Sequence, residues 1–249
     1  MIRERPSPNH EQRGTPPRID MLVLHYTGMQ NAEAALERLC DPRARVSAHY
    51  VIDESGLVWR LVPEARRAFH AGVSCWHGER DLNLPSIGIE IVNPGHEWGY
   101  RPFPEAQMAA VEAVCRDLLS RHPIPPFRVV GHSDIAPDRK TDPGELFDWA
   151  RLARAGIGIW PAPGPHRNSA PVDPARAISG LAAIGYCVAS ADATSAITAF
   201  QRRFRPSRID GALDDETAMR IAEVSAAYAR SRGGLPRRRV RRALGGLRE

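Results

Sequence analysis

The sequence predicts an α/β (α+β) fold: a mixed central β-sheet flanked by helices, with a small C-terminal three-helix domain after it. Three observations lead to this prediction. Short apolar runs of strand length alternate with segments of helical periodicity over residues 21–132. Residues 160–174 then contain five prolines and no periodicity, which is typical of a linker. Helical periodicity alone continues over residues 178–224.

The expected strands are MLVLHY (21–26), a hairpin within residues 47–62, SIGIEIVN (86–93) and FRVVGH (127–132). The first and last are apolar runs, typical of buried strands, and they carry His25 and His132 at their ends. In SIGIEIVN the isoleucines alternate with Gly88 and Glu90, so the Glu90 side chain is expected to face away from them.

Two segments are expected to form helices against this sheet. NAEAALERLC (31–40) has helical spacing, with Asn31 in the position of an N-cap. Residues 104–122 carry apolar side chains at helical spacing and begin at Pro104, and proline is common at the start of a helix.

The composition is that of an ordinary globular protein, with 43% apolar and 25% charged residues in a chain of 249. It contains no run of about 20 apolar residues that could span a membrane. The first 18 residues are charged and proline-rich, without the apolar segment of a signal peptide. We therefore expect a cytoplasmic location, with a periplasmic or extracellular location by a non-standard route as the alternative.

The net charge of +5 does not indicate a nucleic-acid partner. Residues 222–249 hold eight arginines against two glutamates, so the basic excess belongs to the end of the chain. Such a tail is expected to be solvated, with an anionic partner as the alternative. The sequence does not indicate an oligomeric state.

The four cysteines, Cys40, Cys75, Cys115 and Cys187, are widely spaced and form no CxxC pair. This pattern favours buried reduced thiols, with a disulfide framework as the alternative.

Three residues have the chemistry of a metal site. Catalytic zinc sites use three protein ligands drawn from His, Asp, Glu and Cys, and leave a fourth position for water. His25 and His132 end two strands, and strand ends converge at one edge of a sheet. Asp142, in the loop after His132, is able to fold back toward them. On spacing alone, a structural or surface role for these histidines remains the more common alternative.

Lys140 is the only lysine among 34 basic residues. Arginine serves equally well on a surface, so this position favours a chemical role for a compact ammonium group. Beside a metal ligand, such a group could stabilise a developing oxyanion.

Five motifs occur in an order that resembles a known family: LHYTG, SAHYVID, RAFHAG, SIGIEIVN and GHSDIAPDRKTDPG. They are similar to those of the zinc-dependent N-acetylmuramoyl-L-alanine amidases of the amidase type 2 family, whose fold is shared with peptidoglycan recognition proteins. The resemblance covers roughly residues 5–155. The second unit, with LAAIGYCV and AITAFQRRF, is similar to a small peptidoglycan-binding helical module.

This resemblance implies a division of the chain into four parts: a zinc amidase catalytic domain (1–159), the proline-rich linker (160–174), a peptidoglycan-binding-like helical domain (175–228) and an arginine-rich tail (229–249). It also implies that His25, His132 and Asp142 bind zinc (Zn2+), and that Glu90 and Lys140 are catalytic.

The implied activity is hydrolysis of the amide bond between the lactyl group of N-acetylmuramic acid, expected in its 1,6-anhydro form, and L-alanine of the stem peptide, in cell-wall recycling. Peptidoglycan fragments are then the expected partners. A wall-lytic amidase or endolysin is one alternative. A non-catalytic peptidoglycan-binding receptor is another, although it would not need the intact set of ligands and catalytic residues.

Further residues are expected near the substrate. Arg67 and Arg139 could hold peptide carboxylates, because a guanidinium group matches a carboxylate geometrically; a plain surface role is the alternative. Tyr26, His70 and Asn93 are the other candidates. For His70, as for His49, a packing or hydrogen-bonding role is favoured over metal ligation.

Overall fold

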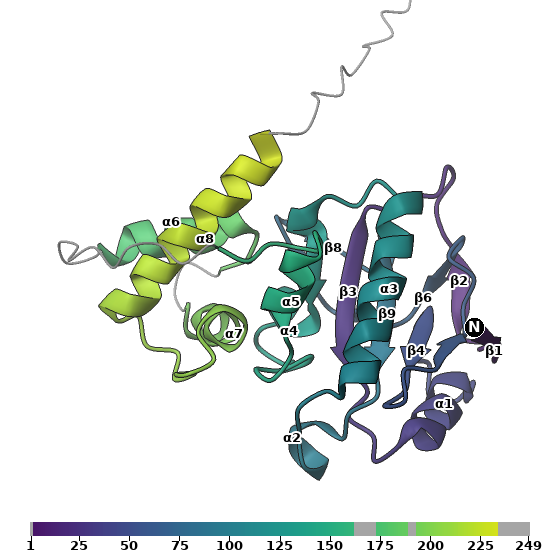
Figure 1. Cartoon of the computed structure of the whole chain (residues 1–249). Coiled ribbons are helices and arrows are strands. Elements are labelled where there is room, and N and C mark those ends of the chain that lie inside the picture. Colours follow the sequence, from purple (N-terminus) through teal and green to yellow (C-terminus); the bar gives the residue numbers. More distant parts are fainter. Residues whose placement is uncertain (1, 162–172, 189–192, 234–249) are drawn as a thin grey trace, which may run out of the picture.

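The structure is a computed structural model that describes residues 2–161, 173–188 and 193–233 (Figure 1). Its centre is a six-stranded sheet with the strand order β1-β5-β4-β9-β3-β10. These strands are β1 (Ile2–Glu4), β3 (Met21–Tyr26), β4 (Tyr50–Ile52), β5 (Val58–Arg60), β9 (Ser86–Ile91) and β10 (Val129–Gly131). The four strands β4, β9, β3 and β10 are parallel, and β5 pairs antiparallel with β4, so the sheet is mixed as predicted.

Two smaller sheets and nine helices complete the described part of the chain. The small sheets pair β2 (His10–Gln12) with β6 (Arg66–Ala68), and β7 (Cys75–Trp76) with β8 (Glu79–Arg80). The helices are α1 (Ala32–Cys40), α2 (Gly95–Trp98), α3 (Glu105–Arg121), the 3-10 helix η1 (Pro126–Arg128), α4 (His132–Ile135), α5 (Trp149–Arg154), α6 (Pro174–Ile184), α7 (Thr194–Phe204) and α8 (Asp215–Gly233). None of these helices is long and apolar enough to cross a membrane.

The strand alternation places the two faces of the sheet in different surroundings. Leu22, Leu24, Ile89 and their neighbours pack against α3, which lies along the sheet in Figure 1. On the opposite face, Val51 belongs to a cluster with the α1 residues Leu36 and Leu39. His25 and Glu90 extend from this second face, because both alternate with residues of the first.

Local signals in the sequence account for most of these elements. Asn31 caps α1, with its side chain accepting a hydrogen bond from the Ala34 N–H as predicted. The turn between β4 and β5 is closed by Asp53, whose carboxylate accepts hydrogen bonds from two backbone N–H groups. Some boundaries differ from the expected ones: β9 ends at Ile91, and the strand before His132 is only Val129–Gly131, so that His132 begins α4.

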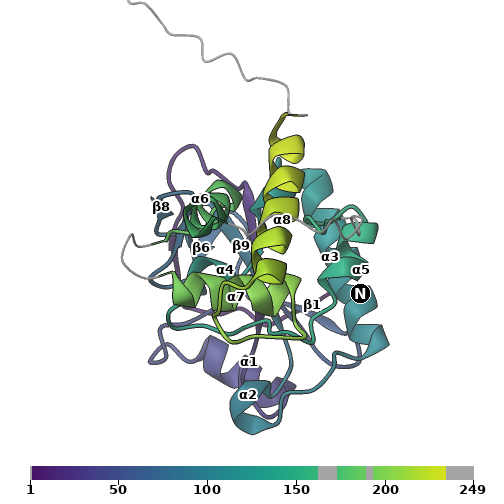
Figure 2. The same cartoon turned by 90° about the vertical axis from the view of Figure 1, so that its left-hand side faces the viewer.

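The three C-terminal helices, α6, α7 and α8, form what we call the helical unit, which Figure 2 shows from its outer side. Its apolar faces do not enclose a separate core. Leu181, Phe200 and Ile221 belong to one cluster with Val23 and Val130 of the central sheet. Helix α8 continues five residues beyond the expected end of this unit at 228. Most of the expected linker, 162–172, and residues 234–249 of the expected tail lie outside the described residues.

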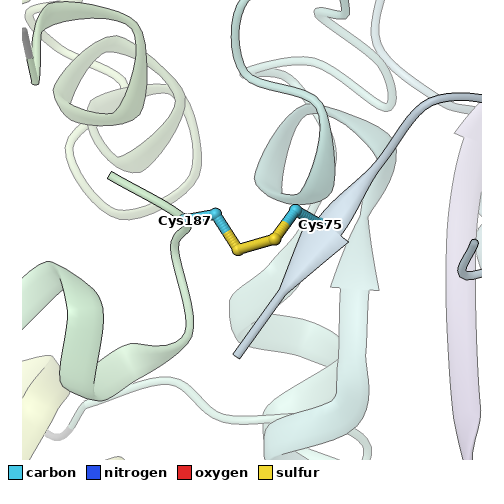
Figure 3. Close-up of a disulfide and its surroundings, with 2 residues drawn as sticks. All are labelled: Cys75 and Cys187. Atoms are coloured by element: carbon cyan, nitrogen blue, oxygen red, sulfur yellow. A yellow bond between two sulfur atoms is a disulfide. The ribbon is translucent and has the colours of Figure 1, made fainter. Parts of the chain in front are cut away.

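A disulfide joins the helical unit to the rest of the protein. Cys75, in β7, is bonded to Cys187, in the segment after α6 (Figure 3). The expectation that all four cysteines are reduced is therefore wrong for this pair, while Cys40 and Cys115 are free thiols. The sequence separation of 112 between the two cysteines explains the error, because no local spacing indicates a pair that only the packing of two units brings together.

Candidate metal centre and active-site cavity

The carboxyl ends of three parallel strands bring the predicted site residues together. His25 is near the end of β3 and lies directly beside Glu90 of β9 in the strand register. His132 follows the last residue of β10, which pairs with β3 on its other side. Parallel strands end at the same edge of a sheet, so residues 107 positions apart in the chain meet there.

Three ligand-type atoms from His25, His132 and Asp142 converge in the interior. The His25 Nδ1 and His132 Nδ1 atoms are 2.9 Å apart. The Asp142 Oδ2 atom lies 3.0 Å from the first of these nitrogens and 3.1 Å from the second. All three side chains are buried, and they form the candidate metal cluster of the described chain.

Hydrogen bonds behind His25 determine which of its nitrogens carries the proton. The Ser86 hydroxyl donates to the Leu82 carbonyl oxygen, so its oxygen accepts from His70 Nε2–H, 3.1 Å away. The His70 Nδ1 atom is then an acceptor, and it receives the His25 Nε2–H over 3.0 Å. The lone pair of His25 Nδ1 therefore points to His132 and Asp142.

His132 is oriented in the same way by a backbone group. Its Nε2 atom is 3.1 Å from the carbonyl oxygen of Ala71, to which it donates, and this leaves the Nδ1 lone pair directed at the cluster. A second hydrogen-bonding partner that fixes the ring and its tautomer is typical of metal-binding histidines.

These charges and lone pairs fit a bound cation. Burial, together with the neighbouring His132, lowers the pKa of His25 to about 4, so its ring is neutral at pH 7. Burial alone would raise the pKa of Asp142, but His132 and His25 hold it well below its usual range. Two imidazole lone pairs and a carboxylate thus face one another, and a divalent metal ion satisfies all three. Two histidines and one carboxylate are a donor set that catalytic zinc sites use.

Next to the cluster lies a cavity of about 480 Å³, which His132 and Asp142 border. Glu90 and Lys140 line this cavity as well. Burial, reinforced by the nearby Asp142 charge, raises the pKa of Glu90 well above its usual value. The Glu90 Oε2 atom is buried and has no hydrogen-bond partner in the described chain. Among the described residues, no hydrogen bond or ion pair holds the Lys140 side chain either, so both groups are available to a ligand in the cavity.

The five expected substrate-contacting residues differ in where they lie. Tyr26 lines the cavity, with its hydroxyl 2.8 Å from Thr141 Oγ1. His70 and Arg139 also line it. However, the Arg139 guanidinium donates to the carbonyl oxygens of Ala71 and Val73, so its hydrogen bonds stabilise the loop that contains these two residues.

Arg67 and Asn93 lie outside this cavity. Arg67 forms ion pairs with Glu11 and Asp81 and lines a second, adjoining hollow of about 400 Å³. The Asn93 side chain is buried, donates to the Arg101 carbonyl oxygen and accepts from the Gly95 N–H. Asn93 therefore shapes the loop beside the cavity from within.

Sequence reasoning missed the support that His70 and Gly88 give to the metal cluster. A Cβ atom on Gly88 would lie only 2.4 Å from the His70 ring, so the strand needs a glycine there for His70 to reach His25. The signal was present in SIGIEIVN, because a glycine within a strand often marks a close approach of another group.

The comparisons with known proteins identify the family. Residues 14–145 match the family described as N-acetylmuramoyl-L-alanine amidase (Amidase_2), and the chain belongs to this family. The protein is therefore an N-acetylmuramoyl-L-alanine amidase.

Individual relatives extend this result. The chain is 39% identical to N-acetylmuramoyl-L-alanine amidase AmiD of Escherichia coli (strain K12), over 81% of this chain and 80% of that protein. It is 37% identical to 1,6-anhydro-N-acetylmuramyl-L-alanine amidase AmpD of the same organism, over 59% of this chain and 87% of that protein. A solved complex of AmiD with anhydro-N-acetylmuramic acid-L-Ala-D-gamma-Glu-L-Lys superposes with a TM-score of 0.76, at 38% identity, covering 87% of this chain and 91% of that one. AmpDh3 from Pseudomonas aeruginosa gives a TM-score of 0.77 at 35% identity, covering 85% and 93%.

Proposed function

We propose that this enzyme uses zinc to hydrolyse the amide bond between the lactyl group of 1,6-anhydro-N-acetylmuramic acid and L-alanine of the stem peptide. The observation that carries the proposal is the convergence, beside one cavity, of three buried ligand atoms with a carboxylate and an ammonium group that have no partner among the described residues. His25, His132 and Asp142 would hold the zinc ion. Bound zinc would supply a Lewis acid that makes water nucleophilic at neutral pH.

Glu90 is suited to move the proton in this reaction. Its carboxylate would accept a proton from the attacking water and deliver it to the departing amine of L-alanine. A carboxylate whose pKa is raised by burial is a stronger base and remains able to return the proton near neutral pH.

Lys140 is suited to stabilise the charge that forms on the lactyl carbonyl oxygen. Its ammonium group borders the cavity and is not neutralised by an ion pair within the described chain. A preorganised donor at such a position typically contributes about 10²- to 10³-fold in rate.

The relatives support the choice of substrate. AmpD is named for the 1,6-anhydro sugar, and AmiD has been solved with an anhydro-muramoyl peptide. We therefore assign soluble anhydro-muropeptides, and with them cell-wall recycling, to this enzyme. Whether the helical unit itself binds peptidoglycan stays a prediction.

The disulfide bears on the compartment in which the enzyme works. Disulfides persist in oxidising compartments such as the periplasm and are rare in the reducing cytoplasm. The Cys75–Cys187 bond therefore supports the alternative location, outside the cytoplasm, over the cytoplasmic one.

The function is tested with the zinc-loaded protein, soluble anhydro-muramoyl tripeptide and, separately, intact sacculi, with mass spectrometry of the products. Hydrolysis in ¹⁸O-water should release free tripeptide and place one ¹⁸O atom in the lactyl carboxylate of the sugar product. Glu90→Gln is the matched control, because it keeps all three metal ligands while removing the proton acceptor.

Two outcomes would contradict the proposal. Binding of the fragment by zinc-loaded protein without product release would indicate a receptor. Efficient cleavage of sacculi with no turnover of soluble fragments would indicate a wall-lytic enzyme.

A further inference from the structure

The short helix α4, which begins with His132, contains a second buried acidic residue, Asp134, which takes no part in the metal cluster. Its Oδ2 atom accepts the backbone N–H of Gly131 over 2.8 Å, which fixes the start of α4 immediately before His132. Its Oδ1 atom accepts the Tyr186 hydroxyl over 2.6 Å, and its Oδ2 atom also accepts from Arg203 Nη1. Two of the three donors to this carboxylate thus come from the helical unit or the segment that joins its helices.

Arg203 is built into this contact rather than lying on a surface. Its side chain is only 2% exposed. The guanidinium lies 3.8 Å from the ring centre of Trp149 and donates from Nη2 to the Val129 carbonyl oxygen of β10. A buried charge pair of this kind tolerates little displacement, because either partner alone would be a desolvated charge.

A second connection reaches His132 from the other side, through the loop 71–76. The Ala71 carbonyl oxygen accepts the His132 Nε2–H, and the loop ends at Cys75, which is bonded to Cys187 (Figure 3). Trp76 is fully buried and forms a β-bridge with Tyr186.

From these contacts we propose that the helical unit is a positioning element of the metal site, with Arg203 and Tyr186 holding Asp134 and thereby His132. The inference rests on the proposed function in one respect, namely that His25, His132 and Asp142 bind a metal ion. Arg203 and Tyr186 are positioning residues: they act through Asp134 and do not reach the cavity that the substrate would occupy.

The chain offers a matched control for Arg203. Arg205 is on the same helix end and is similarly buried, with 6% of its side chain exposed. Its partners, Asp214, Glu216 and Thr217, lie in α8 or immediately before it. Arg205→Met therefore removes a comparable ion-pair network without touching the loop of His132.

The test measures the affinity of the metal-free full-length protein for Zn²⁺ alone, by competition with a chromophoric chelator, and the visible spectrum of the Co²⁺-loaded protein. Arg203→Met should weaken Zn²⁺ binding by about 10- to 100-fold and alter the Co²⁺ spectrum, as expected for support of a metal ligand. Arg203→Lys should restore part of the affinity, and Arg205→Met should remain near wild type. Tyr186→Phe, which removes one hydroxyl group, should give a smaller loss and serves if Arg203→Met does not fold.

A double-mutant cycle tests the route. If Arg203 acts through Asp134, adding Arg203→Met to Asp134→Asn should weaken Zn²⁺ binding little further. Equal affinities of Tyr186→Phe, Arg203→Met and wild type, equal losses in Arg203→Met and Arg205→Met, or fully additive losses in the cycle would each overturn the inference. A wild-type protein that binds Zn²⁺ but cleaves no muropeptide would contradict only the proposed function; one that binds no Zn²⁺ would contradict both.

Discussion

Replacing His70 tests whether the hydrogen bond behind His25 sets the metal affinity. His70→Leu removes the acceptor for His25 Nε2–H and leaves that donor in a site where His25 is 1% exposed, so water has no access to replace the bond. An unsatisfied buried donor costs about 1–3 kcal/mol. Each 1.4 kcal/mol is about a tenfold change in a binding constant, so this cost corresponds to roughly 5- to 150-fold weaker Zn²⁺ binding. The reason is that the His25 ring can regain a hydrogen-bond partner only by turning its Nδ1 atom away from the metal site.

His70→Asn is the informative partner variant. The Asn side-chain oxygen takes nearly the position of His70 Nδ1 and can still accept from His25, although it loses the hydrogen bond to Ser86. Competition titration with a chelator should therefore rank wild type first, His70→Asn second and His70→Leu last. A His70→Leu protein that is folded and binds Zn²⁺ within about threefold of wild type would refute the tautomer argument.

Three further predictions concern other groups. Glu90→Gln should lower kcat by about 10²- to 10⁴-fold while leaving Zn²⁺ affinity nearly unchanged; equal losses in both would make Glu90 a ligand. Lys140→Arg should lower kcat more than it raises KM, and full turnover would remove the chemical role of this lysine. Burial, together with the Arg13 guanidinium, lowers the pKa of His49 to about 3. In the unfolded chain the pKa of this histidine is near 6.5. Between these two values the unfolded chain binds a proton that the folded protein does not. Stability is therefore present above pH 6.5 and lost as the pH falls toward 3. His49→Gln should therefore make the free energy of unfolding depend less steeply on pH, by about 1.4 kcal/mol per pH unit between about pH 5.5 and 4. Urea unfolding of metal-free protein measures this slope, and a slope equal to that of wild type would contradict the prediction.

The strands that carry the site could be predicted because each has a local signature. The isoleucine alternation correctly placed Glu90 on the face opposite Ile87, Ile89 and Ile91, since side-chain direction in a strand depends only on position. The first apolar run correctly placed His25 near the end of its strand, and the second placed His132 one residue too far, because β10 ends at Gly131 and His132 begins α4. The meeting of these two histidines followed from the general rule that parallel strands end at one edge of the sheet.

Predictions about single polar side chains succeeded less well, because their contacts depend on the loops around them. Arg139 borders the cavity, but its guanidinium donates to carbonyl oxygens of Ala71 and Val73, which no pattern near Arg139 indicates; a contact with a substrate carboxylate stays a prediction. Asn93 lies beside the cavity in sequence but has its amide turned into the loop that it stabilises.

The packing of the helical unit against the central sheet could not be predicted from sequence periodicity. Periodicity shows that a helix has an apolar face but not which other face covers it, so the apolar stripes of α6, α7 and α8 predicted a three-helix domain without showing what it packs against. In the structure they share one cluster with the central sheet. The same limit applies to Asp134, which in GHSDIAP has only its closeness to His132 to distinguish it, whereas its partners Tyr186 and Arg203 are 52 and 69 residues away.

Because the shared core, the disulfide and the Asp134 contacts all join the helical unit to the loops around His132, removal of this unit would expose part of the core and also release one metal ligand from its supports. A truncated chain ending at residue 159 is thus a poor measure of what the helical unit contributes to binding peptidoglycan, and single substitutions such as Arg203→Met separate the two roles.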